Sequence, residues 1–254
     1  MVILACGIFG LFWGSFLAAS LVRLRLRDAK FWLGRSRCLS CQKQLALRDL
    51  IPVLSFLFLR GRCRFCQQKI PYQDFALEIL TGFAFAVTAY LGYDFISTHL
   101  IWCLFLASVL IFLAAYDFLY YEIPDEVVLP SLGFIWIGSL LSFTPTPLAS
   151  SLGILLGGSA FALLVLISQG RWLGGGDIRF AALLGGFLGP LGLLIAIFLA
   201  SLSGVIIGGG LILTKRKKLS SPIPFGPLLA LGGFLSLFFG TQIWNWYLLN
   251  FWVS

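Results

Sequence analysis

Residues 178–214 read IRFAALLGGFLGPLGLLIAIFLASLSGVIIGGGLILT, an apolar run with a single charged residue, Arg179. A helix of about 20 residues crosses a bilayer core of about 30 Å, so one helix over the whole run would overshoot the membrane. Gly189-Pro190-Leu191-Gly192, near the middle of the run, is typical of a turn. The run therefore predicts two short membrane spans joined by a turn.

The rest of the chain has the same apolar character. Of its 254 residues, 59% are hydrophobic and 11% are charged, whereas about a quarter of the residues in a soluble domain are charged. This composition excludes a soluble globular enzyme, a disordered chain and a secreted disulfide scaffold. The expected fold is an all-α polytopic membrane protein with about eight transmembrane helices. The other apolar runs are 2–22, 75–93, 98–118, 127–143, 149–168 and 225–252.

The basic residues predict the orientation in the membrane. Residues 23–78 hold 12 of the 18 Lys and Arg, and no Lys or Arg precedes the first apolar run. By the positive-inside rule, the N-terminus then faces outward and the segment from residue 23 is cytoplasmic. Eight spans also place the basic cluster 215–218 inside, whereas one span over 178–214 would place it outside. The net charge of +8 is explained by this rule and by anionic lipid, and no nucleic-acid partner is expected because no typical basic binding patch is found.

The segment after the first run is a polar insert with a cysteine pattern. Cys38-x-x-Cys41 and Cys63-x-x-Cys66 can supply the four thiolates of a tetrahedral zinc site. Four cysteines leave no open coordination position, so this zinc is expected to be structural. A redox-active pair and two incidental thiol pairs remain as alternatives. The expected organisation is a first transmembrane helix at 1–22, a cytoplasmic zinc-binding insert at 23–74 and a membrane-embedded core at 75–254.

Two aspartates fall at the same predicted depth in the membrane. Asp117 lies at the inner end of the third run and Asp177 at the inner start of the sixth. Two carboxyls at short range share one proton, so one can act as general base on a water and the other as general acid, as in aspartic peptide hydrolysis. The glycines at 174–176 would let the backbone before Asp177 adopt a positive φ and approach a substrate strand.

Other roles for the acids remain open. Asp177 can also cap a helix, as can Asp125 after Pro124. Glu78, expected in the first turn of the second span, is explained by the helix dipole. A transporter could use an acid pair as a proton relay, although such acids would be expected near the bilayer midplane.

These residues resemble the bacterial type IV prepilin peptidase family, whose members are Gly-x-Gly-Asp intramembrane aspartic peptidases and N-methyltransferases of type IV pili and type II secretion. Besides the cysteine pairs, the resemblance rests on ordered motifs over most of the chain. They are Gly14-Ser15-Phe16-Leu17, Ile51-Pro52-Val53-Leu54-Ser55, Arg60-Gly61-Arg62-Cys63, Glu78-Ile79-Leu80-Thr81-Gly82, Asp117 through Ile123-Pro124-Asp125, Gly174-Gly175-Gly176-Asp177 and Pro224-Phe225-Gly226-Pro227.

The resemblance implies that Asp117 and Asp177 are catalytic, with Gly174 and Gly176 in support. It implies a location in the bacterial inner membrane and a prepilin or pseudopilin substrate, whose short basic leader is cut after glycine. It also implies methylation of the new amino terminus from S-adenosylmethionine, at a site involving the insert. The insert is basic, so the acids expected to attract the leader lie beside Asp117. They are Glu122, Asp125 and Glu126.

The departures from the family pattern fall in the N-terminal part of the chain. Gly61 is followed by Arg62 where the family usually has the methylation-linked Gly-Lys, and Asp49-Leu50-Ile51-Pro52, Ala18-Ala19 and Tyr72-Gln73-Asp74-Phe75 also differ. Two alternatives follow: a peptidase without methylation, and a non-enzymatic zinc-knuckle assembly factor of the membrane.

Overall fold

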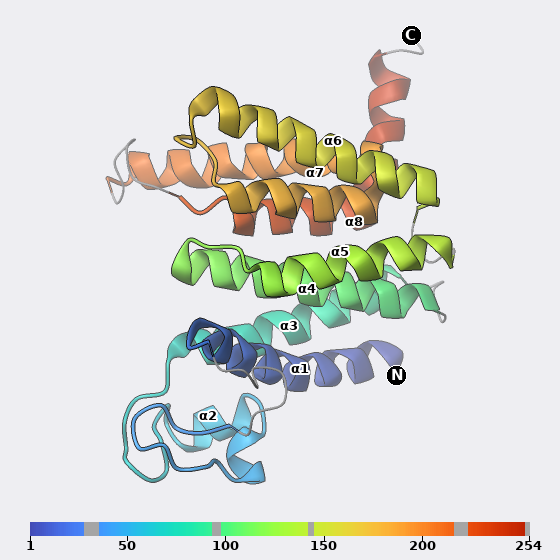
Figure 1. Ribbon diagram of the computed structural model, residues 1–254. Coiled ribbons are helices and arrows are strands. Elements are labelled where there is room, and N and C mark those ends of the chain that lie inside the picture. Colours follow the sequence, from blue (N-terminus) through green and yellow to red (C-terminus); the bar gives the residue numbers. More distant parts are fainter. Residues whose placement is uncertain (28–35, 93–97, 142–144, 216–222, 252–254) are drawn as a thin grey trace. The chain divides into compact units, whose positions relative to one another are not determined.

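The computed structural model describes residues 1–27, 36–92, 98–141, 145–215 and 223–251 (Figure 1). The chain forms two compact units, Met1–Asp94 and Phe95–Ser254. Within the described ranges all regular structure is helical, apart from two isolated bridges in the insert. The expected all-α fold is therefore confirmed. Most of the basic cluster at 215–218 lies outside the described residues.

The first unit pairs two long helices with the cysteine insert. Helix α1 (Val2–Arg25) packs against α3 (Tyr72–Leu91). The backbones approach closely, because a Cβ placed on Gly10 would lie only 2.8 Å from the Thr81 carbonyl oxygen. Contacts through small residues are typical of helices packed within membranes. The insert between them contains η1 (Leu47–Leu50) and α2 (Leu54–Phe58).

The second unit is a bundle in which α7 packs against both α6 and α8 (Figure 1). Glycine again permits the closest contact, since Gly153 of α6 and Gly185 of α7 face each other without room for a Cβ on either. The hydroxyl of Ser150 donates a hydrogen bond of 2.8 Å to the Gly186 carbonyl oxygen beside this contact. The helices are α4 (Thr98–Tyr120), α5 (Asp125–Leu140), α6 (Pro147–Ser168), α7 (Gly175–Leu213) and α8 (Gly226–Phe251).

Helix α7 is interrupted where the sequence predicts a turn. Gly189 has φ 71° and ψ 178°, which no helix contains, and Pro190 follows it. Contacts with α8 show that the chain reverses there. Before the break, Leu184 lies beside Gly233; after it, Gly192 accepts a hydrogen bond from the Ser236 hydroxyl and Gly204 lies beside Leu228. The two halves of α7 therefore run in opposite directions, and the predicted division of residues 178–214 is confirmed.

Six of the described helices are long and apolar enough to cross a membrane, with Gly175–Leu213 counted once. Division at Gly189 makes two helical segments of α7. The remaining predicted span corresponds to α5, which has 16 residues and contains Pro130, fewer than the roughly 20 that a span needs. Every predicted apolar run thus corresponds to a helical segment, and the molecule is an all-α polytopic membrane protein.

Candidate functional site

Asp117 lies in the last turn of α4 and is only 7% exposed. Its Oδ2 atom accepts a hydrogen bond of 2.8 Å from the backbone N–H of Gly226, the first residue of α8. A Cβ on Gly226 would come within 2.6 Å of the same oxygen. Glycine at 226 is therefore required by the close approach of α8 to Asp117. The motif at 224–227 was noted in the sequence, but its contact with Asp117 was not foreseen.

Asp177 lies in the first turn of α7 and is 9% exposed. Its Oδ2 atom accepts a hydrogen bond of 2.9 Å from the backbone N–H of Gly174, the N-cap residue. The carboxylate thus contributes to the capping of α7, as one of the alternatives anticipated, although from the third helical position rather than as the N-cap itself. This bond uses one of its two oxygens.

The fold brings these two acids near one another within the second unit. The carboxyl groups of Asp117 and Asp177 are close enough to interact electrostatically. Both belong to helix ends that are buried against neighbouring helices, where an ionisable group is costly unless it is paired or functional.

The glycines before Asp177 act differently from what the sequence suggested. None of the three has a positive φ; Gly174 has φ −84°, and Gly175 and Gly176 begin the helix. Instead, a Cβ on Gly176 would lie 2.9 Å from the Cβ of Ile123 in the α4–α5 loop. Gly176 therefore allows the start of α7 to pack against this loop, and the expected left-handed backbone is not found.

The acidic residues after Asp117 surround the start of α5. Asp125 forms an ion pair with Arg179, which lies two residues after Asp177 on α7. Both side chains are well exposed, at 48% and 39%, so the pair adds little to stability. It does connect the start of α5 to the start of α7. Glu122 and Glu126 are exposed at the same end of α5.

The four predicted metal ligands come together in the first unit. The Sγ atoms of Cys38, Cys41, Cys63 and Cys66 all lie within 4.8 Å of one another, and those of Cys38 and Cys66 are 3.7 Å apart. A tetrahedral zinc with Zn–S bonds of about 2.3 Å would separate its sulfurs by about 3.8 Å. The donor set and its spacing fit a tetrathiolate metal site.

The two cysteine loops share one backbone pattern. In each, the first cysteine donates its N–H to the carbonyl five residues later and accepts a bond from the N–H four residues later. The glutamine at that fourth position has a positive φ in both loops. This repeat was not predicted, although it is visible in the parallel strings RCLSCQ at 37–42 and RCRFCQ at 62–67. The four bonds are Cys38 N to Lys43 O, Gln42 N to Cys38 O, Cys63 N to Gln68 O and Gln67 N to Cys63 O.

The pKa values of Cys38 and Cys66 are shifted in opposite directions. The backbone N–H of Cys41 is the main cause that lowers the pKa of Cys38 to about 6. At Cys66 the backbone N–H of Gln68 also favours the thiolate, but desolvation and the neighbouring thiols outweigh it and raise the pKa to about 11. Thiolates are the form that binds metal, and the lowered pKa of Cys38 favours this form.

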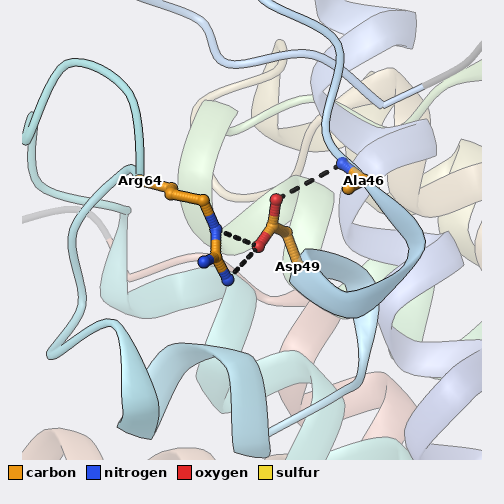
Figure 2. Close-up of polar contacts among 3 residues, drawn as sticks. All are labelled: Ala46, Asp49 and Arg64. Atoms are coloured by element: carbon orange, nitrogen blue, oxygen red, sulfur yellow. Dashed lines mark hydrogen bonds and ion pairs between the residues drawn. The ribbon is translucent and has the colours of Figure 1, made fainter.

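An ion pair between Arg64 and Asp49 links the second cysteine loop to η1 within the insert (Figure 2). Arg64, between Cys63 and Cys66, lies 2.7 Å from the Asp49 carboxylate in η1. The other oxygen of Asp49 accepts a bond of 3.3 Å from the backbone N–H of Ala46. The Asp49 side chain is 2% exposed, and a buried charge needs such partners. The sequence identified Asp49 only as a departure from the family pattern.

Two further residues of the insert motifs have clear structural positions. Gly61 has φ 66° and lies against the Phe56 ring, so a side chain there would be strained; Arg62 follows it in one of the bridges. Glu78 lies in the second turn of α3 rather than the first, because the helix begins at Tyr72. Its Oε2 atom accepts a bond of 2.7 Å from the backbone N–H of Val53. The helix dipole therefore does not account for Glu78.

These features define a polytopic helical membrane protein with two buried acids in its helix bundle and a four-cysteine cluster whose spacing fits a metal ion. Comparison with known proteins gives the family. A model described as Bacterial Peptidase A24 N-terminal domain matches residues 8–91, and one described as Type IV leader peptidase family matches residues 104–209. No solved structure gives a significant match.

Relatives of known name cover most of the chain. A Prepilin leader peptidase/N-methyltransferase of Aeromonas hydrophila is 36% identical over 85% of this chain and 76% of its own length. A protein of the same name from Bacillus subtilis is 34% identical over 95% of this chain and 96% of its own. The Type 4 prepilin-like proteins leader peptide-processing enzyme of Escherichia coli is 34% identical over 81% and 76%. The chain belongs to the type IV leader peptidase family.

Proposed function

We propose that this protein cleaves the basic leader of type IV prepilins or pseudopilins after glycine, at the cytoplasmic face of the bacterial inner membrane, and methylates the new amino terminus. The main observation in support of a peptidase activity is the pair of buried carboxyl groups, Asp117 and Asp177, which interact within one unit. Family membership and the names of the relatives support the same conclusion.

The chemistry uses the two carboxyl groups as an acid–base pair. One carboxylate removes a proton from water, and the hydroxide forms a bond to the scissile carbonyl carbon. The other, protonated carboxyl then donates its proton to the leaving nitrogen as the C–N bond breaks. The N–H groups of Gly226 and Gly174 hold Oδ2 of Asp117 and Asp177 respectively. In this proposal they fix both carboxyl groups and leave Oδ1 to face the water and the peptide.

The substrate crosses the site in a defined orientation. Its apolar helix remains in the lipid beside the second unit, and its basic leader lies in the cytoplasm with the insert. Glu122, Asp125 and Glu126 supply the negative charge that attracts the leader. Asp125 reaches the leader only in competition with Arg179, its partner in the structure.

The insert holds a structural zinc between its four cysteines and takes part in methylation. S-adenosylmethionine supplies an electrophilic methyl group for the freed amino terminus. This second activity rests on the family and the names of its relatives. A peptidase that lacks methylation would retain cleavage alone.

The proposal is tested with the purified full chain in detergent or liposomes and a synthetic prepilin-like substrate, with the products identified by mass spectrometry. Cleavage after glycine, followed by a gain of one methyl group when S-adenosylmethionine is present, is the expected result. Intact substrate after prolonged incubation with well-folded protein would instead favour the non-enzymatic assembly factor.

A further inference from the structure

The first unit contains a cavity of about 820 Å³. It lies within the range of about 300 to 1,000 Å³ that is usual for small-molecule sites. The insert lines one side of it and the cytoplasm-proximal turns of α1 and α3, in the proposed orientation, line the other. Its apolar lining includes the aromatic rings of Phe56 and Phe75, which stack at 4.7 Å between centroids. Cys38 and Cys63 of the metal cluster also contribute to the wall.

Two acids of α3 line this cavity without an ion-pair partner among the described residues. Asp74 and Glu78 both line it and are four residues apart, on one face of the helix. Glu78 is 8% exposed. Like charges at this spacing repel, and burial increases the cost. Among the described residues, no Lys or Arg forms an ion pair with either acid, whereas the third acid of the wall, Asp49, is paired with Arg64. A bound cation would remove this cost.

The geometry of Glu78 indicates that its position is held rather than incidental. Its carboxylate accepts the N–H of Val53, a β-branched residue with φ 62°. A β-branched residue in the left-handed region is strained, and such strain is found where the surrounding structure fixes a functional arrangement. The bond anchors one oxygen of Glu78 at the cavity wall.

The remaining lining matches the other groups of a zwitterionic nucleoside. Arg37 and Lys69 also line the cavity and supply positive charge for a carboxylate. S-adenosylmethionine combines a purine, a sulfonium cation, an ammonium cation and a carboxylate. The cavity offers aromatic rings, adjacent acids and basic side chains for these groups.

We propose that this cavity is the methyl-donor site, in which Asp74 and Glu78 face the cationic part of S-adenosylmethionine and the Phe56–Phe75 pair borders the purine. The inference rests on the proposed methylation. In the transfer, the S–CH₃ bond breaks as an N–CH₃ bond forms to the lone pair of the deprotonated amine, which leaves S-adenosylhomocysteine and a methylammonium group that releases one proton.

The test compares two ligands that differ in charge at sulfur. Binding of S-adenosylmethionine and of S-adenosylhomocysteine, the neutral thioether, is measured by calorimetry on the full chain in detergent. The wild-type protein is expected to prefer the sulfonium. Asp74→Asn and Glu78→Gln are each expected to weaken its binding roughly tenfold to a hundredfold, the range for losing a charge-assisted contact, with a smaller effect on the thioether. Equal losses for both ligands, or none, would contradict the assignment of these acids.

Glu78→Gln keeps an oxygen that can accept the Val53 N–H, so the backbone at Val53 is expected to remain in place. Asp117→Asn, in the other unit, is the matched control: it should bind the donor like wild type while failing to cleave prepilin. Asp74→Asn and Glu78→Gln should show the reverse, with cleavage kept and donor binding lost. Loss of cleavage in all variants and in wild type would instead overturn the proposed peptidase, without bearing on the cavity.

A second measurement needs no variant. The wild-type chain is labelled with a photoreactive adenosine analogue of S-adenosylmethionine, and the modified peptide is identified by mass spectrometry. We expect the label to fall within residues 36–78, and we expect excess S-adenosylmethionine to prevent this labelling. Competable label confined to residues 98–251 would overturn the proposal even if the substituted proteins failed to fold.

Discussion

At the scale of single residues, glycine backbone determines how the candidate acids are held. Asp117 and Asp177 each accept one backbone N–H, from Gly226 and Gly174 respectively. A main-chain donor cannot rotate away as a side chain can, so each carboxyl is oriented before any substrate arrives. The sequence indicated both acids and a capping role for Asp177, but not the Gly226 donor, because Gly226 is 109 residues from Asp117.

Gly226→Ala should damage the peptidase. The new Cβ would lie within 2.6 Å of Asp117 Oδ2, and forcing a methyl group into such packing costs about 1–3 kcal/mol. We expect the leader cleavage rate to fall about tenfold to a hundredfold, measured with purified protein and a prepilin-like peptide. Gly133→Ala is the control, because nothing lies within 4 Å of a Cβ there. Equal activity of the two variants would refute the proposed role of the α8 contact.

At the scale of elements, the break in α7 and the two cysteine loops show what local sequence can predict. The break was predictable because the apolar run is too long for one span, and a Gly-Pro pair within it favours an interruption of the helix at that point. The cysteine cluster was predictable because each Cys-x-x-Cys spacing is itself a local ligand pair. The Arg64–Asp49 and Arg179–Asp125 ion pairs were not, since each joins separate elements whose approach depends on the tertiary packing. The reason for Gly176, a contact with Ile123, is likewise tertiary.

The repeated loops predict a single shared ion. Cys63→Ser removes the buried thiol of the four and should reduce bound zinc from about one ion per chain to well below half of that, with a lower unfolding temperature of the insert. Metal content by mass spectrometry and thermal unfolding provide the measurement. Cys6→Ser in α1, outside the cluster, should leave the zinc content unchanged. Wild-type protein purified without any zinc would contradict the assignment.

At the scale of the whole molecule, charge is divided between the two units. The N-terminal segment is strongly basic, whereas Glu122, Asp125 and Glu126 cluster at one end of the second unit near Asp117. The amino-acid sequence alone predicted this division, because the charged residues of each segment can be counted without a structure. It could not supply the distances between side chains that chemistry requires.

Neutralising that cluster should affect substrate binding rather than the chemical step. With Glu122→Gln, Asp125→Asn and Glu126→Gln combined, we expect KM for a basic-leader substrate to rise several-fold at low salt, with kcat nearly unchanged, and the difference to shrink as salt screens the charges. A substrate whose leader lysines are replaced by glutamine should not distinguish the variant from wild type. An unchanged KM for the basic-leader substrate would show that these acids do not take part in substrate recognition.

The central claim is that Asp117 and Asp177 act as one catalytic pair, and cleavage rates of Asp117→Asn, Asp177→Asn and the double variant test it most directly. Each single change is expected to slow cleavage by about a thousandfold or more, in protein that accumulates in the membrane and retains its zinc. The double variant should be no slower than the slower single variant, because the groups act as a unit. Near-normal cleavage by either single variant would contradict the claim.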